Sequence, residues 1–222
     1  MSGGAESPIK GSIPKDHLIA LGPQLFPLEQ KINFLLELEC SGHSDEALLL
    51  SCCYIDALAQ VLYHNAGTGE RFARVLIEHS GNESFGLIDP QGLCNQLIGA
   101  GMAELAEGIQ SRLPLANNRG EGDYWHNMRE VLELTKTFLS PPQLEKLKRE
   151  AWRGSIAHLV YKEIRNTQVH SIVKSIGLSF PSGTHKGKPI LEVRFPVLLS
   201  ALRRIFQELK ELCATAGAYV GR

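Results

Sequence analysis

The chain has 222 residues, 43% hydrophobic and 21% charged, a composition typical of a globular protein with one sizeable core. No apolar run approaches the ~20 residues that cross a bilayer, so we expect no membrane partner. The net charge of −1 hides an asymmetry: residues 1–144 carry 9 Lys and Arg against 18 Asp and Glu, and residues 145–222 carry 14 against 6. This asymmetry indicates a basic surface for an anionic partner, unless the acidic half simply docks on the basic half.

The five cysteines are odd in number and include no Cys-x-x-Cys pair. They indicate neither a disulfide framework nor a zinc site, so we expect a reducing, cytoplasmic location. The sequence also lacks the motifs of phosphate-binding loops, dinucleotide-binding loops and zinc proteases. We therefore expect no metal and no cofactor.

Residues 1–27 are rich in Gly, Pro and Ser and are expected to form a flexible N-terminal arm ahead of one helical domain over 28–222. Apolar residues at helical spacing then predict helices, although Gly99 and Gly101 weaken the last of these. The first four predicted helices span 28–39, 44–64, 70–79 and 93–109. The irregular region 80–125, which ends in the loop PLANNRGEGD, is a candidate insertion into the bundle.

Helical spacing returns in the second half, where helices are predicted over 124–139, 143–152 and 156–175, with Ser155 as an N-cap. Residues 177–180 and 190–195 alternate with period two around a Gly- and Pro-containing loop, which predicts a β-hairpin over 176–195. Pro196 opens a final amphipathic helix to Leu212. The expected fold is mostly α: a helical bundle with one small antiparallel β-hairpin near the C-terminus.

One stretch, EIRNTQVHSI (residues 163–172), carries residue types suited to RNA cleavage. His170 can exchange protons near neutral pH, and Arg165 can hold phosphate oxygens in its planar fork. Together they supply the proton shuttle and the cation that cleavage of a phosphodiester without a metal requires. Asn166 and His170 share a face of an α-helix, whereas Arg165 and His170 differ in direction by about 140° and do not converge within one helix.

The spacing of Arg and His alone is weak, because it also occurs at Arg74–His79 and Arg153–His158. Only the third copy has a polar Asn after the Arg and lies in the middle of a predicted helix. The competing interpretation is that the polar residues of this copy form the solvated face of an amphipathic helix.

The stretch YKEIRNTQVH resembles the signature of the HEPN superfamily, in which an Arg is followed by a polar residue and, after four to six intervening residues, by a His. The resemblance implies a four-helix-type bundle that dimerises, so that two motifs meet and form a metal-independent ribonuclease site. Arg165 and His170 would then be catalytic and Asn166 the supporting polar residue. Relatives include toxins and phage-defence proteins, so an antitoxin or regulatory protein is a further candidate partner; others are inactive binding modules.

Basic residues near the motif are expected to guide the RNA backbone. They are Lys146, Lys148, Arg149, Arg153, Lys162 and Lys174. The segment GTHKGK (183–188) either adds a basic fringe or is a solvated hairpin tip. The sequence thus predicts an endoribonuclease that cleaves single-stranded RNA by 2′-hydroxyl attack at a homodimer interface. The alternative is an inactive HEPN-like module that binds RNA or a protein partner.

Overall fold

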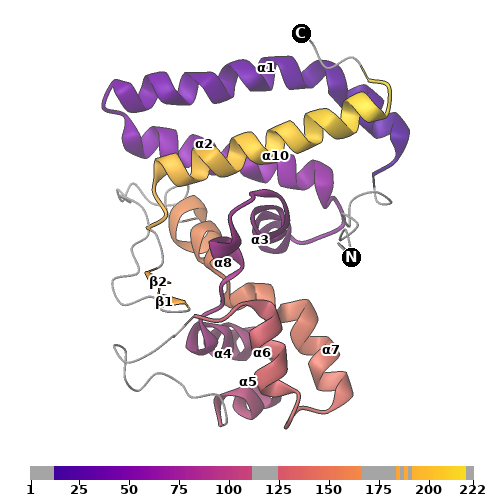
Figure 1. The fold of residues 1–222 in the computed structure, drawn as a ribbon, viewed down its shortest axis with the longest axis vertical. Coiled ribbons are helices and arrows are strands. Elements are labelled where there is room, and N and C mark those ends of the chain that lie inside the picture. The colour runs from indigo at the N-terminus through magenta and orange to yellow at the C-terminus, as the bar shows by residue number, and fades with distance from the viewer. Residues whose placement is uncertain (1–12, 112–124, 167–183, 186–187, 190–191, 219–222) are drawn as a thin grey trace.

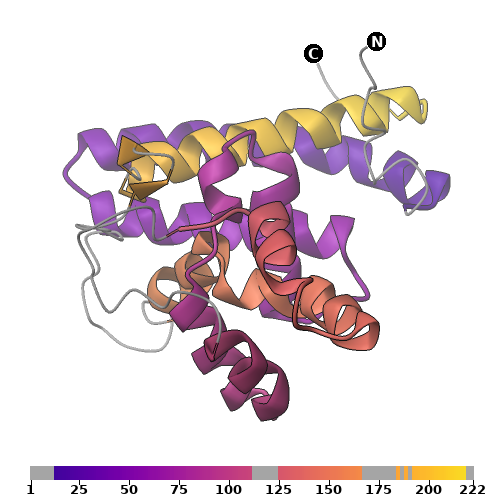
Figure 2. The same ribbon diagram turned by 60° about the horizontal axis from the view of Figure 1, so that its bottom comes forward.

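The computed structural model describes residues 13–111, 125–166, 184–185, 188–189 and 192–218, which form a large helical bundle and a small lobe (Figures 1 and 2). The large bundle contains α1 (Lys15–Cys40), α2 (Ser44–Leu62), α3 (Thr68–His79), α8 (Ile156–Leu159), the π-helix η4 (Val160–Asn166) and α10 (Phe195–Thr215). The small lobe contains α4 (Pro90–Gly99), α5 (Ala103–Gln110), α6 (Met128–Thr135), α7 (Pro141–Glu150) and the 3₁₀ helix η3 (Ala151–Gly154). A second 3₁₀ helix, η2 (Glu83–Gly86), precedes it. The mostly α prediction is confirmed.

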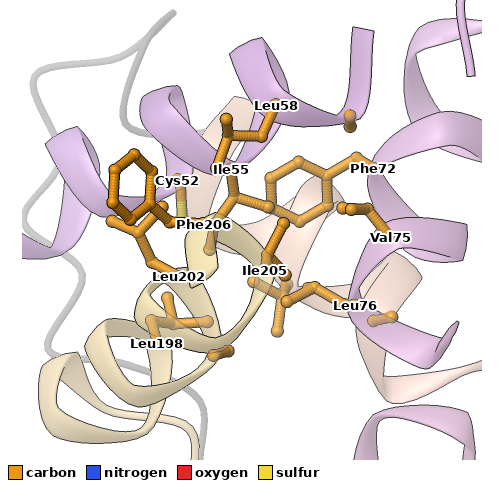
Figure 3. Close-up of a cluster of buried hydrophobic side chains, with 14 of the residues drawn as sticks. Cys52, Ile55, Leu58, Phe72, Val75, Leu76, Leu198, Leu202, Ile205 and Phe206 are labelled. Atoms are coloured by element: carbon orange, nitrogen blue, oxygen red, sulfur yellow. The ribbon is translucent and has the colours of Figure 1, made fainter. Parts of the chain in front are cut away.

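The core of the large bundle lies where α2, α3 and α10 meet (Figure 3). Ile55 on α2, Phe72 on α3 and Ile205 on α10 are each 0% exposed. Burial of one such side chain contributes about 1.5–3 kcal/mol. The helices predicted at 44–64 and 70–79 are confirmed, and this shared core fixes their positions relative to each other.

Helix α1 begins much earlier than the sequence predicted, and the expected flexible arm is wrong for residues 15–27. Leu18, Leu25 and Ile32 recur every seven residues, so they share one side of α1 and are buried against the bundle. This burial outweighs the backbone hydrogen bonds that the two prolines inside the helix cannot make. Residues 1–12 lie outside the described part.

The small lobe has a hydrophobic cluster of its own, which includes Leu93, Leu97, Ile109, Val131 and Leu147. The single helix predicted over 93–109 is wrong, because Gly101 takes a positive φ of 74° and separates α4 from α5. The helix predicted over 124–139 is shorter, starting at a capping box between Asn127 and Glu130. The lobe begins near Ile88 and extends past the predicted boundary at 125 to η3; its being an insertion stays a prediction.

Backbone pairing at Ile88 joins the lobe to the bundle. Ile88 forms antiparallel bridges with His126 on one side and with Ser155 on the other. The backbone N–H of Ile156 donates to the carbonyl of Leu87 at 2.9 Å. The two ends of the small lobe therefore lie side by side at the base of the large bundle.

The predicted hairpin of 177–180 with 190–195 is not supported. Between residues 176 and 195, the pairing that the structure describes joins β1 (Thr184–His185) to β2 (Lys188–Pro189), inside the segment expected to be the connecting loop. Residues 177–180 and 190–191 lie outside the described part. Phe195, expected at the end of the second strand, is the first residue of α10, because Pro196 favours the first turn of a helix.

Candidate functional site

Arg165 and Asn166 lie at the end of η4, and this segment is a π-helix where the sequence predicted an α-helix. Ser155 caps the preceding turn as predicted, since its Oγ accepts the backbone N–H of His158 at 3.2 Å. Val160 and Ile164 anchor η4 in the core, and each is 0% exposed. The angle of about 140° between Arg165 and His170 assumes an α-helix, and the segment that ends at Asn166 is not an α-helix.

Arg165 is held by contacts within the bundle. Its Nη2 donates to Oδ2 of Asp56 on α2 at 2.9 Å, and its Nη1 donates to Oδ1 of Asn166 at 3.2 Å. The guanidinium carbon lies 5.6 Å from the centre of the Tyr161 ring. Its Nε is buried and has no hydrogen-bond partner among the described residues. The Arg165 side chain is thus oriented, and some of its N–H groups have no acceptor among the described residues.

Asp56 is shared by two arginines. Nε of Arg71, in the first turn of α3, donates to Oδ1 of Asp56 at 3.2 Å, while Arg165 uses Oδ2. The side chains of Asp56, Arg71 and Arg165 are 13%, 17% and 22% exposed, so all three are largely withdrawn from water. The cluster carries two positive charges and one negative charge.

The field of Arg165 reaches the neighbouring turn of α2. Burial raises the pKa of the Cys53 thiol, and the Arg165 guanidinium partly opposes this rise. Burial, followed by the neighbouring Cys53, also raises the pKa of the fully buried Cys52 thiol, and the Arg165 guanidinium again opposes the rise. Both thiols therefore remain protonated and non-nucleophilic at neutral pH.

Sequence reasoning missed Asp56 and Arg71. Asp56 lies between Ile55 and Ala57 in a strongly apolar helix, and a carboxylate in such a position was the available signal. Arg71 carried no local signal, because its role depends on a contact with another helix. His170 and Lys174 lie outside the described residues, so Arg165 and Asn166 are the only motif residues that the described part brings together.

The predicted RNA-binding residues that are described lie on three elements. Lys162 is exposed on η4. Arg153 on η3 donates to Glu150 at 2.7 Å and lies over the Trp152 ring at 4.6 Å. Arg149 lines a pocket of about 510 Å³ between α3 and α7, whose charged side chains are Glu70, Arg74, Glu78, Lys148, Arg149 and Glu150. This pocket balances positive and negative charge.

Both residues of the competing Arg–His pair, Arg74 and His79, form contacts within the protein. Arg74 donates to Glu78 at 3.1 Å. His79 is buried, with Nδ1 3.1 Å from Glu208 on α10 and Nε2 2.7 Å from the Tyr63 hydroxyl. These contacts tie α3 to α10 and to the end of α2.

The pair Arg153–His158 is also internal. His158 is 8% exposed and packs edge-on against Trp152 and stacked on Tyr161, with ring centroids 5.0 and 6.2 Å apart. Burial, followed by the charges of Arg153 and Lys162, lowers the pKa of His158 to about 4. The ring is therefore neutral at physiological pH and packs as part of the core.

Part of the charge asymmetry is neutralised within the protein, as expected if the acidic half of the chain docks on the basic half. Asp56 pairs with Arg165, and Glu29 on α1 pairs with Lys210 on α10 at 3.2 Å. Each of these ion pairs joins the acidic half of the chain to the basic half. The basic surface for an anionic partner stays a prediction.

The class of protein that these features define is a mostly helical bundle with a largely buried arginine–carboxylate–arginine cluster at the junction of α2, α3 and η4. No helix in the described part is long and apolar enough to cross a membrane. No group of three or more His, Cys, Asp or Glu within the described ranges is arranged to hold a metal ion. No protein-family model, curated protein or solved structure matches the chain.

Proposed function

We propose that the protein is a metal-independent endoribonuclease of the HEPN type, acting on single-stranded RNA as a homodimer. The observation that carries the proposal is the Arg165–Asn166 pair of the motif, held beside Asp56 in a largely buried position. An arginine that is oriented before substrate arrives stabilises developing phosphorane charge without a reorganisation cost. The mostly helical architecture agrees with the resemblance.

In the proposed reaction, the 2′-oxygen of a ribose attacks the adjacent phosphorus and the bond from phosphorus to the 5′-oxygen breaks. One imidazole takes the proton from the 2′-hydroxyl, and a protonated imidazole gives a proton to the leaving 5′-oxygen. Each His170 of the dimer supplies one of these roles. Arg165 remains protonated throughout and binds the non-bridging oxygens. The products are a 2′,3′-cyclic phosphate and a 5′-hydroxyl.

The test is incubation of the purified chain with labelled single-stranded RNA in EDTA, followed by analysis of the product ends. We expect cyclic phosphate ends, and a loss of at least ~100-fold in kcat for Arg165→Ala and for His170→Ala. His64→Ala is the matched control, since His64 is exposed just after α2 and lies outside the motif. Specific activity should fall on dilution as the dimer dissociates. Intact RNA in every assay with a folded dimer rules out this function for the RNAs tested.

A second candidate function is an inactive HEPN-like module that binds RNA or a protein partner. The ion pair between Arg165 and Asp56 at 2.9 Å favours it, because a paired arginine is less available to a reacting phosphate. This alternative predicts salt-dependent RNA binding, or capture of one partner, without cleavage. The end-group assay separates the two functions.

A further inference from the structure

We propose that Arg71 is a second phosphate-binding arginine of this site, and that Asp56 is the positioning residue that sets both guanidinium groups; this inference rests on the proposed function. Arg71 lies outside the motif, on a different helix, 94 positions before Arg165 along the chain. The ligand is one phosphodiester of the RNA backbone.

The first argument is the number of donors left over. A guanidinium has five N–H donors in a rigid fork. Arg71 uses its Nε on Asp56, and its two Nη atoms have no hydrogen-bond partner among the described residues. Each Nη atom of Arg165 donates once, to Asn166 or to Asp56, and so keeps one N–H, whereas its buried Nε is closed off from a ligand. The two arginines therefore retain several donors for a third group.

The second argument is charge. Two guanidinium groups share one carboxylate, so the cluster has a formal charge of +1, and its side chains are 13–22% exposed. Positive charge withdrawn from water attracts an anion more strongly than the same charge on an open surface. An internal phosphodiester carries one negative charge, which neutralises the cluster.

The third argument is rigidity. Asp56 binds Arg71 through Oδ1 and Arg165 through Oδ2, so one carboxylate fixes the directions of both forks. Each of the three residues is next in sequence to a side chain that is 0% exposed: Ile55, Phe72 or Ile164. The backbone on α2, α3 and η4 is therefore held by the core, and the guanidinium groups are organised before RNA arrives.

RNA binding tests Arg71 separately from catalysis. Binding of a labelled single-stranded RNA of about 20 nucleotides is measured against salt, with the full chain carrying His170→Ala so that the RNA stays intact. Adding Arg71→Gln should lower the slope of log K against log salt by about 0.7, the loss of one phosphate contact. Arg74→Gln is the control: Arg74 lies one turn further along α3 and contacts Glu70 and Glu78. This control should leave the slope unchanged.

Cleavage kinetics test positioning. In the chain with His170 intact, we expect Arg71→Gln to lower kcat about 100-fold. Arg71→Lys keeps the charge but loses the fork, so it should retain the salt slope and still lower kcat. Asp56→Asn removes a negative charge, so it should leave KM unchanged or lower while kcat falls at least ~10-fold. A merely structural ion pair would not separate kcat from KM in this way.

The outcomes distinguish the two proposals. If the wild-type chain cleaves RNA and folded Arg71→Gln and Arg71→Lys keep full kcat and the full slope, the Arg71 proposal is overturned and the ribonuclease stands. If the wild-type chain cleaves nothing but Arg71→Gln still loses one phosphate contact, the ribonuclease fails and the phosphate site stands. If Arg71→Gln does not fold, Arg71→Lys decides by its kcat. If the wild-type chain binds no RNA, both proposals fail.

Discussion

The buried ring of His158 makes the stability of the large bundle sensitive to mild acid. Its pKa falls from 6.5 to about 4 on folding, first because burial disfavours the charged ring and then because Arg153 and Lys162 repel it. Above pH 6.5 the ring is neutral in both the folded and the unfolded chain. Between pH 6.5 and pH 4 the unfolded chain binds a proton that the folded chain does not, so the free energy of unfolding falls as the pH falls.

The size of this effect follows from the shift in pKa. A change of one pKa unit corresponds to about 1.4 kcal/mol, so the full shift is equivalent to about 3 kcal/mol of unfolding free energy. The contribution is fully present above pH 6.5 and is lost by about pH 4. A loss of this size is a large part of the stability of an ordinary domain.

The assay is urea unfolding of the wild-type chain and of His158→Gln, which has no titrating ring at this position, from about pH 7.5 to pH 4. The difference in unfolding free energy between the two chains should change by about 3 kcal/mol over this range, in favour of His158→Gln at low pH. His64→Gln, at an exposed position, controls for the removal of an imidazole. Parallel curves for the wild-type chain and His158→Gln from pH 7.5 to about pH 4 would refute the reasoning.

Three further predictions concern packing and capping, each measured by chemical denaturation. Gly154→Ala should destabilise the chain by about 1–3 kcal/mol, because the new Cβ would lie 2.6 Å from Cβ of Leu93. Its control Gly99→Ala, with no atom within 4 Å of the new Cβ, should stabilise α4 by about 0.5–1 kcal/mol; equal effects at the two glycines would contradict this packing. Ile205→Ala should cost about 2–5 kcal/mol, since the side chain is 0% exposed, and a loss below ~1 kcal/mol would contradict the core described here. Asn127→Ala removes a cap of α6 and should cost about 1 kcal/mol, and no loss would mean that the cap is not formed in solution.

The sequence was most informative where apolar spacing was long and uninterrupted. The helices α2 and α10 could be predicted because their buried residues recur at helical intervals over many turns. The first half of α1 is not predicted from its composition, because proline and glycine residues are typical of loops. The seven-residue recurrence of Leu18, Leu25 and Ile32 was visible in the same stretch and was the stronger signal.

The candidate site could be predicted only in part, for a physical reason. The motif residues Arg165 and Asn166 are neighbours in sequence, so a local pattern finds them. Asp56 and Arg71 reach Arg165 through the packing of three separate elements, and Asp56 is 109 positions away from Arg165 along the chain. The π-helical form of η4 could not be predicted either, because π-helices are rare and helical apolar spacing is interpreted as an α-helix.

The pairing of Leu87 with Ile156, and of Ile88 with Ser155, brings the two ends of the small lobe together. Because its two ends meet within one hydrogen bond, a short turn between α3 and α8 would span the same gap, and the loop-closure entropy would change little. A change within the small lobe therefore need not shift α3 against η4. The arginine cluster lies wholly on α2, α3 and η4, outside the small lobe, so a change in the lobe leaves its residues in place.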